Sequence, residues 1–254
     1  MIEAQKYNNN FFTDLEAESY QSARAVLPIV NRLITPASVV DIGCGTGMWL
    51  KTWLEDIGVK DILGVEGPYV KPEMIKVPAD KVIFRDLKNS LQIDRKFDLA
   101  MSLEVAEHLP ASSAETFIQT LTSLSDVILF SAALPDQGGT YHINEQYPEY
   151  WAAIFKKFGY MPVDCIRPEI YNNTKVEWWY QQNILLYIRQ TVVEKYTELL
   201  NTAHLTHPGY LTRIHSALYG LKVAQIKRTE TAWGYINWKW YEFKCKYLKK
   251  NEGK

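Results

Sequence analysis

The chain has 254 residues, of which 47% are hydrophobic and 22% are charged, and its formal net charge is −1. This length can bury a sizeable core, and the near-neutral charge excludes a general polyanion binder and disfavours nucleic acid as a partner. No apolar run approaches the ~20 residues that cross a bilayer, and the first residues do not have the pattern of a signal peptide. Three widely spaced cysteines favour a reducing, cytoplasmic setting over a disulfide framework.

The first part of the chain predicts a long helix followed by a buried strand. Apolar residues recur at helical spacing over residues 14–34, and Pro36 ends that pattern. A short β-branched run then predicts a strand over residues 38–42.

A glycine turn follows this strand directly. Residues 41–47 read D-I-G-C-G-T-G, and Met48 opens a helical pattern. Glycines let the backbone take positive φ and let a ligand approach closely, while the helix start offers free N–H groups. The acid precedes the glycines, unlike the dinucleotide fingerprint G-x-G-x-x-G, so it suits a ligand with a positive charge or an amine near the turn. A plain turn with incidental glycines is the structural alternative.

Three further strands are predicted over residues 61–66, 81–85 and 97–102, and an acidic residue stands at or just after the end of each. A carboxylate at the tip of the second strand, Glu66, can accept hydrogen bonds from both hydroxyls of a ribose. After the fourth strand, Glu104 and His108 are expected on one face of the first turn of a helix. A capping role for Glu104 and Glu107 stays open, because acids suit the start of a helix dipole.

A long polar loop follows the predicted fifth strand, residues 125–132, and precedes a helix over residues 151–158. Long loops in compact domains are often functional, and Gly138-Gly139 gives this loop freedom to close. Two later strands are predicted over residues 161–167 and 184–189. The alternation of strands and helices predicts an α/β fold with a doubly wound, mostly parallel sheet.

The glycine turn and the acid-ended strands, in this order and at βα spacing, resemble the class I S-adenosylmethionine-dependent methyltransferases over residues 36–190. The resemblance implies S-adenosyl-L-methionine as cofactor and a seven-stranded Rossmann-like methyltransferase sheet whose final strand is antiparallel. An N-terminal helix precedes this sheet and a C-terminal helical extension follows it. We expect the methyltransferase domain over residues 1–190 and the extension over residues 191–254.

The resemblance also implies which residues bind the cofactor. In the family, the acid of the third strand and the residue after it bracket the adenine, and the start of the E-x-x-E-H-L segment helps to wall the cofactor. The predicted cofactor-binding residues are Asp41, Gly43, Cys44, Gly45, Gly47, Glu66, Asp86, Leu87, Leu103 and Glu104. No acidic or histidine cluster in the sequence requires a metal, so none is expected.

Residues 142–151 read H-I-N-E-Q-Y-P-E-Y-W, which is similar to a segment of methyltransferases that act on glycans and other hydroxyl compounds. By this resemblance His142 is the general base, and Asn144 or Glu145 orients it or the substrate. The ordinary pKa of histidine suits removal of a hydroxyl proton near neutral pH. The alternative is that His142 only pins the loop.

The acceptor is expected to be a sugar hydroxyl in a glycan. Aromatic residues near the predicted site can stack on sugar rings, although each of them can instead be a core residue. Of these, Trp178, Trp179 and Tyr180 are expected on one strand, from which at least one faces a pocket or a partner. The residues after the fourth strand lack the Asn/Asp-Pro-Pro-Tyr/Phe segment of DNA amino methyltransferases, which argues against N-methylation of bases. A small-molecule methyltransferase of secondary metabolism and a non-catalytic module that binds the cofactor are the alternatives.

The tail over residues 222–254 is basic and aromatic. It holds nine Lys/Arg and three Asp/Glu, and Trp233, Trp240 and Tyr247 recur every seven residues. This pattern predicts an aromatic stripe on a basic helix, which either packs on the enzyme body or on a second copy as a dimer contact, or makes peripheral contact with an anionic membrane.

Overall fold

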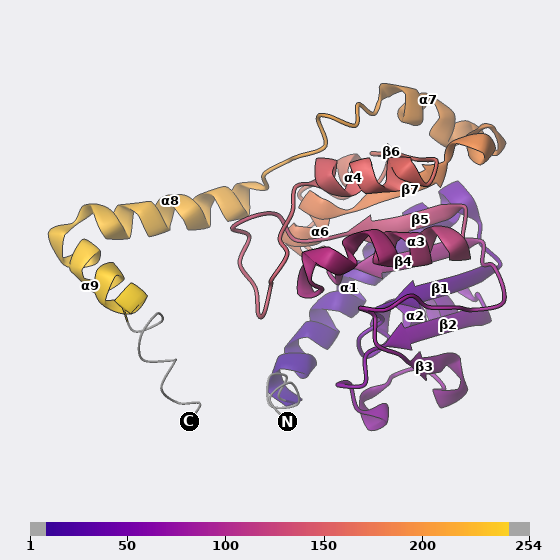
Figure 1. Ribbon diagram of the computed structural model, residues 1–254, viewed down its shortest axis with the longest axis horizontal. Coiled ribbons are helices and arrows are strands. Elements are labelled where there is room, and N and C mark those ends of the chain that lie inside the picture. Colours follow the sequence, from indigo (N-terminus) through magenta and orange to yellow (C-terminus); the bar gives the residue numbers. More distant parts are fainter. Residues whose placement is uncertain (1–8, 244–254) are drawn as a thin grey trace. The chain divides into compact units, whose positions relative to one another are not determined.

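The computed structural model describes residues 9–243, which fall into two compact units, one ending at Arg213 and the other beginning at Ile214 (Figure 1). The first unit holds a seven-stranded sheet in the order β3-β2-β1-β4-β5-β7-β6. Its strands are β1 Ser38–Ile42, β2 Asp61–Glu66, β3 Val82–Phe84, β4 Leu99–Leu103, β5 Val127–Ser131, β6 Tyr160–Val163 and β7 Leu185–Arg189. The first five strands are parallel, and β7 runs antiparallel to both β5 and β6. The predicted doubly wound, mostly parallel fold with an antiparallel final strand is therefore confirmed.

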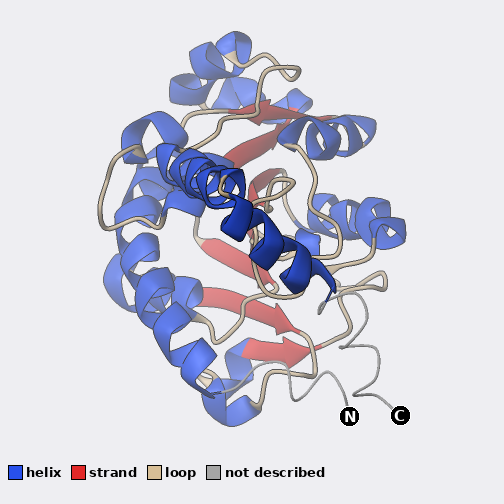
Figure 2. Cartoon of the chain, turned by 90° about the vertical axis from the view of Figure 1, so that its left-hand side faces the viewer, coloured by secondary structure: helices blue, strands red, loops and turns tan. Residues whose placement is uncertain are grey.

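Helices of the first unit cover both faces of this sheet (Figure 2). They are α1 Asn9–Ile34, α2 Met48–Lys51, α3 Ala114–Leu124, α4 Pro148–Lys157, α5 Arg167–Ile170, α6 Trp178–Asn183 and α7 Thr197–Leu205, with a π-helical turn over Thr52–Ile57 after α2. Successive side chains of a strand point to opposite faces, so Val39 belongs to the hydrophobic cluster that includes residues of α1, α2 and α7, whereas Val40 belongs to the cluster that includes residues of α3 and α4. The two faces form two separate hydrophobic clusters.

The strand order reverses between β1 and β4, because β2 follows β1 on one side and β5 follows β4 on the other. Ligands of open α/β sheets bind beyond the carboxyl ends of the strands at such a reversal. The segments that follow β1 and β4 are therefore brought together at this edge of the sheet.

The segment after β4 differs from its prediction. Ala106–His108 form a single 3₁₀ turn, and the α-helix begins only at Ala114. Pro110 explains the delay, because it disfavours the α conformation of the residue before it and has no N–H to donate. Glu104 lies ahead of the turn at φ 56°, so it does not belong to a helix.

Trp178, Trp179 and Tyr180 lie on the helix α6, so the expected strand at this position is wrong. The side chain of Gln181 explains the helix: its Oε1 accepts from Asn172 N (2.7 Å), and its Nε2 donates to Val176 O (2.6 Å). These bonds fold the preceding segment back against α6. They depend on one side chain that bonds to backbone groups a few residues earlier, which the pattern of hydrophobic residues does not reveal.

The strand predicted over residues 161–167 ends at Val163, and Arg167 begins α5. The guanidinium of Arg167 is fully buried. It donates to both carboxylate oxygens of Asp164 at 2.8 Å, to Gln182 O at 3.0 Å and to Leu211 O at 2.7 Å. One buried side chain thus joins α5, the end of α6 and the last residues of the first unit.

The second unit consists of the helices α8 Ser216–Glu230 and α9 Ala232–Phe243 as far as it is described. A single helix was expected, but Thr231 is extended, and its Oγ1 accepts from Gly234 N at 2.9 Å, as an N-cap does. Trp233 and Trp240 lie on α9 and are exposed, whereas Tyr247 is outside the described residues. In the described part of the chain, no helix is both long and apolar enough to cross a membrane.

Candidate active site

The glycine turn after β1 needs glycine at Gly43. Its φ is +85°, and a Cβ added there would lie 2.5 Å from Val105 Cγ2, behind the turn. Gly45 is also left-handed, at φ +56°, but a Cβ there would meet nothing within 4 Å. The space beside Gly45 therefore lies on the open side of the turn, where a ligand can approach the backbone.

A cavity of about 530 Å³ opens at this turn. It is lined by α1, the glycine turn, the segment after β4, the loop after β5 and α6. Four acidic residues, Glu16, Asp41, Glu104 and Glu107, contribute to the lining, and among the described residues neither a lysine nor an arginine does. The described lining therefore has no lysine or arginine that would repel a ligand with positive charge.

Two buried carboxylates stand behind the turn. Burial, with a contribution from Glu66, raises the pKa of Asp41 to about 8. Burial also raises the pKa of Glu66, but its hydrogen bonds from Gly67 N (2.6 Å) and Gly45 N (2.5 Å) oppose that rise. S-adenosyl-L-methionine fits this environment, because it carries a sulfonium and an ammonium group and needs the close backbone approach that Gly45 allows.

The predicted cofactor residues divide into two groups. Asp41, Gly43, Cys44, Gly45, Leu103 and Glu104 line the cavity, whereas Gly47, Glu66, Asp86 and Leu87 do not. Glu66 holds the backbone of the turn, as described above. Asp86 is exposed and accepts from Lys88 N at 3.0 Å, and Leu87 is buried in the core.

Glu104 adopts an unusual backbone conformation and is held by amides. A non-glycine residue at positive φ costs about 1–3 kcal/mol, so surrounding contacts must enforce it. Glu104 N donates to Ser131 O at 3.0 Å. Its carboxylate accepts from Asn183 Nδ2 (3.1 Å) and Gln137 Nε2 (3.2 Å), and these bonds act against the rise in its pKa that burial causes. Gln137 and Asn183 were not predicted, since they are distant in sequence and carry no motif.

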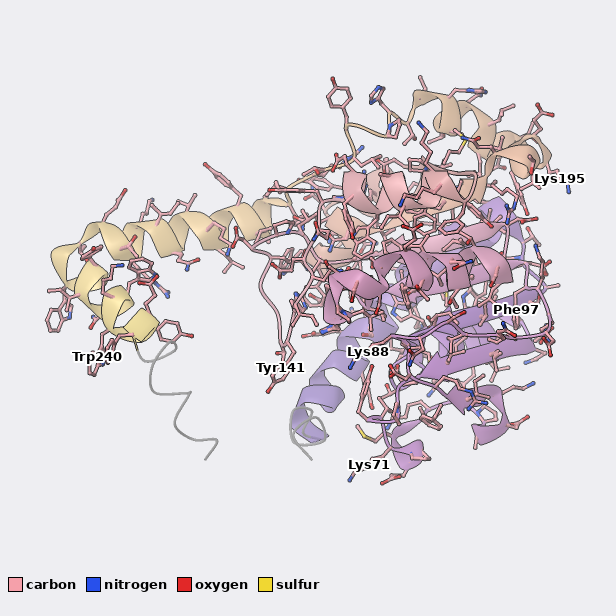
Figure 3. All side chains as sticks on the ribbon, viewed as in Figure 1. Lys71, Lys88, Phe97, Tyr141, Lys195 and Trp240 are labelled. Carbon is pink, nitrogen blue, oxygen red and sulfur yellow. The ribbon has the colours of Figure 1, made fainter. Side chains whose placement is uncertain are left out.

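The loop after β5 is tied to the segment after β4. Glu107 O accepts from Ile143 N at 2.9 Å and from Asn144 N at 3.0 Å. Tyr141 lies at the outer tip of this loop (Figure 3). His142 Nδ1 is 2.9 Å from Glu145 Oε1, and Glu145 Oε2 accepts from Asp136 N at 2.8 Å. Of the predicted catalytic residues, His142 lines the cavity, while Asn144 and Glu145 stand behind it.

Gly139 makes room for the ring of His142. A Cβ on Gly139 would lie 2.3 Å from His142 Cε1, and its φ is +147°. The second glycine of the pair therefore has a steric role, in addition to the freedom that the sequence suggested.

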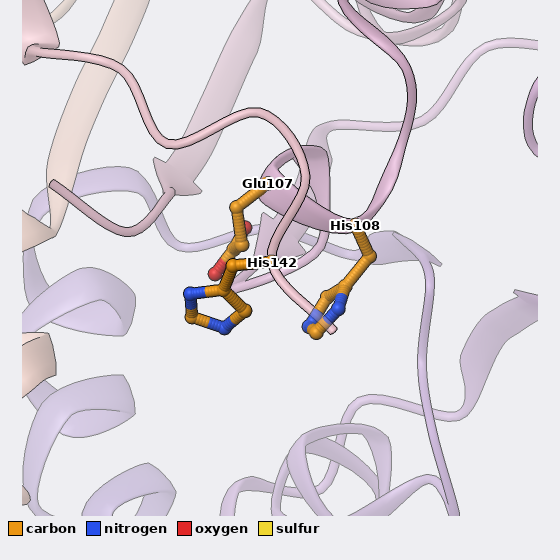
Figure 4. Close-up of side chains that lie close together, drawn as sticks. All are labelled: Glu107, His108 and His142. Atoms are coloured by element: carbon orange, nitrogen blue, oxygen red, sulfur yellow. The ribbon is translucent and has the colours of Figure 1, made fainter. Parts of the chain in front are cut away.

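His142 meets Glu107 and His108 in the cavity wall (Figure 4). The two rings pack edge to face, with centroids 4.8 Å apart. Glu107 is completely buried, and burial together with the neighbouring Glu104 raises its pKa well above the usual range. Burial and His142 lower the pKa of His108 to about 4. One potential metal-ligand atom from each residue lies within 4.8 Å of the others. The sequence alone did not reveal this cluster, because 34 residues separate the two histidines.

Aromatic side chains of α6 form another wall. Trp178, Trp179 and Tyr180 all line the cavity, and Tyr180 meets Trp49 edge to face with centroids 5.1 Å apart. Trp151, in contrast, is 2% exposed and packs in the core against Phe130.

The chain matches a known protein family and several solved structures. The methyltransferase-domain family matches residues 15–183, and no match was found among curated protein sequences. Among solved structures, a chain from a complex containing the Haloferax volcanii Trm112 methyltransferase activator matches with a TM-score of 0.53 and 12% identity, over 71% of this chain and 94% of that one. Human N-acetylserotonin methyltransferase in complex with S-adenosylmethionine matches with a TM-score of 0.50 and 15% identity, over 70% and 55%. The methyltransferase domain of bacterial CtHen1-C gives a TM-score of 0.49 and 19% identity, over 66% and 96%.

At these identities the matches with TM-scores of 0.53 and 0.50 support the fold alone, whereas the family match spans most of the first unit. The match begins in α1 and ends with α6, so it includes the glycine turn, the segment after β4 and the aromatic wall. The chain therefore belongs to the methyltransferase-domain family and is a class I S-adenosylmethionine-dependent methyltransferase.

Proposed function

We propose that this enzyme transfers a methyl group from S-adenosyl-L-methionine to a hydroxyl of a sugar in a glycan. The observation that carries the proposal is the His142–Glu145 pair, in which Nδ1 of a cavity-lining histidine is held by a carboxylate at 2.9 Å. With Nδ1 engaged, Nε2 is the ring atom available to the acceptor. A histidine oriented in this way suits removal of a hydroxyl proton.

The bound cofactor supplies an activated methyl group, and the protein's own residues position the two reactants. In the proposed arrangement the glycine turn and Asp41 line the cofactor side of the cavity, and Glu66 holds the backbone of the turn in place. His142 Nε2 accepts the hydroxyl proton as the acceptor oxygen bonds to the methyl carbon and the carbon–sulfur bond breaks. Holding the reactants in line is worth ~7–11 kcal/mol, and the base contributes ~10²–10⁴-fold.

A sugar acceptor is supported by the character of the walls. Trp178 and Trp179 are half-buried and offer aromatic faces that can stack on a sugar ring. Acidic side chains accept hydrogen bonds from hydroxyls, while the lack of lysine and arginine in the described lining disfavours phosphorylated acceptors.

Buried Cys44 and half-buried Cys165 are free thiols, which supports a cytoplasmic setting for the reaction.

The test uses methyl-labelled S-adenosylmethionine and host extract separated into glycan, protein, nucleic-acid and small-molecule pools. Label in the glycan pool, lost with His142→Gln and retained with the exposed-histidine control His204→Gln, is the expected result. Label only in the small-molecule pool would favour a methyltransferase of secondary metabolism. Label in the nucleic-acid pool alone would overturn the proposal.

A further inference from the structure

We propose that Glu107, His108 and His142 bind one divalent cation of the first transition row, which holds and activates the acceptor hydroxyl. The inference rests on the proposed function and replaces one step of it. Direct proton acceptance by His142 gives way to ionisation of a hydroxyl that the cation polarises, and His142 becomes a ligand.

The geometry of the cluster suits a single ion. The three potential ligand atoms all lie within 4.8 Å of one another. Three ligands of one cation, each bonded at about 2.0–2.2 Å, lie about 2.8–3.8 Å apart, so the side chains have to move inward by about 1–2 Å to close on an ion. The side chains already converge from two segments into one wall of the cavity (Figure 4).

Buried polar atoms of the cluster lack hydrogen-bond partners of good geometry, which favours a bound ligand. Glu107 is 0% exposed, and within the described residues its carboxylate oxygens have weak interactions with the backbone of Ala133 and of Glu107 itself but no hydrogen bond of good geometry. His108 Nδ1 is likewise buried without a partner there. Buried polar groups in native proteins are almost always paired, so a carboxylate and an imidazole nitrogen left open side by side indicate a species that binds both.

Supporting contacts fix the ligands as they do in metal sites. A metal-binding histidine usually donates its other ring N–H to a carboxylate or a backbone carbonyl. Glu145 holds Nδ1 of His142 in this way, and Asp136 N holds Glu145. His108 has a hydrogen bond with the backbone of Tyr141. The cluster therefore has an outer shell as well as three inner groups.

The charge of the cavity also favours a cation. Glu104 lies beside Glu107, and the described lining holds no lysine or arginine to neutralise either carboxylate. Two imidazoles and one carboxylate suit Mn²⁺, Fe²⁺, Co²⁺ or Zn²⁺ better than the all-oxygen sites of Ca²⁺ and Mg²⁺.

Three protein ligands leave positions open for an acceptor oxygen, as in catalytic metal sites. A cation lowers the pKa of a hydroxyl that it contacts, so the proton can leave to water near neutral pH. The acceptor oxygen then bonds to the methyl carbon, and the sulfur–carbon bond breaks with its electron pair on sulfur. The step needs no other reactant.

The experiment titrates Mn²⁺ into the full-length, chelator-treated protein without cofactor or acceptor and follows free and bound Mn²⁺ by electron paramagnetic resonance. We expect one bound Mn²⁺ per chain, with couplings from two imidazole nitrogens in the pulsed spectrum. Glu107→Gln, His108→Asn and His142→Asn should each weaken binding at least ~100-fold, while Glu145→Gln, which acts through His142, should weaken it ~10–100-fold. His204→Asn, a change of an exposed histidine, serves as the matched control.

Binding of S-adenosylmethionine and thermal unfolding check that each variant is folded. Should a variant fail to fold, the imidazole couplings of the unaltered protein still decide the question. Mn²⁺ binding without imidazole couplings, no binding, or binding that the three variants leave intact would overturn the cation site. None of these results concerns the acceptor, so a failed sugar assay beside a positive Mn²⁺ titration would reject the proposed function alone.

Discussion

The proposed cofactor side of the cavity and its proposed acceptor side are built in different ways. On the cofactor side, the glycine turn follows β1 directly. Its shape depends on the backbone conformation of the glycines and on amide hydrogen bonds to Glu66. On the acceptor side, Glu107 and His142 meet because the backbone carbonyl of Glu107 accepts from Ile143 N and Asn144 N. The local sequence determines the glycine turn, whereas contacts between residues distant in sequence bring Glu107 and His142 together.

We expect this difference to separate cofactor binding from chemistry. Side chains of the proposed acceptor side should be open to change without altering the turn, and changes in the turn should leave the His142–Glu145 pair in place. Three substitutions test how far that separation holds, and a fourth compares the two units.

The largest effect is expected from His142→Gln. We expect kcat to fall ~10²–10⁴-fold, because the side chain that activates the acceptor hydroxyl, as a base or as a ligand of the cation, is lost. The Kd for S-adenosylmethionine should not change, since the glycine turn is intact. Single-turnover methyl transfer measures the loss in rate, and calorimetry measures the Kd for S-adenosylmethionine. A large loss of cofactor affinity would show that the two sides are not separable.

Asp41→Asn should act on the cofactor side. Loss of a charge-assisted contact should weaken cofactor binding about 10- to 150-fold. The folded-state pKa of Asp41 is about 8, above its ordinary 3.8, so the cofactor-free protein loses stability as pH rises from about 4 through 8. The asparagine variant lacks this loss, so above pH 8 its cofactor-free form should melt at a higher temperature than the unaltered protein. Equal melting temperatures at pH 9 would contradict the assignment.

Gly43→Ala tests the contact between the turn and the segment after β4. The added methyl would collide with Val105 at 2.5 Å, in addition to the strain of a positive φ. Gly45→Ala has the strain without the collision, so it is the matched control. We expect Gly43→Ala to lower the free energy of unfolding by ~1–3 kcal/mol more than Gly45→Ala does. Denaturant unfolding of both variants gives the difference in their free energies of unfolding. Equal losses would mean that the Val105 side chain moves aside without cost.

The smallest effect is expected in the second unit. Trp233 is 73% exposed, so Trp233→Ala should change the free energy of unfolding by no more than ~0.5 kcal/mol and leave methyl transfer unchanged. Trp151→Ala, in the core of the first unit, should cost ~3–5 kcal/mol by comparison. Loss of liposome binding by Trp233→Ala would favour membrane contact, and a shift in oligomeric state would favour the dimer contact.

The contrast between the two sides also explains what could be predicted from sequence. β1, β2 and the glycine turn were placed correctly, because their hydrophobic runs and glycine spacing are local signals. The helical α6 and the 3₁₀ turn before α3 were not predicted, because the side-chain hydrogen bonds of Gln181 and the steric effect of Pro110 decide them, and neither appears in the spacing of hydrophobic residues. The Glu107–His108–His142 cluster lies beyond any local pattern, because its parts meet only once β4 and β5 are paired.

Arg167 sets a lower limit on the length of an active chain. Its guanidinium depends on Leu211 O, and Leu211 N in turn donates to Glu149 at 2.7 Å. A protein cut at residue 190 would remove one acceptor, Leu211 O, from the buried guanidinium next to α6, although Asp164 and Gln182 O would still be bonded to it. A buried donor left without its partner costs ~1–3 kcal/mol. The aromatic wall would lose its support, although every residue that faces the cavity would still be present. A minimal version of this enzyme therefore has to run through Arg213, well past the last residue of its active site.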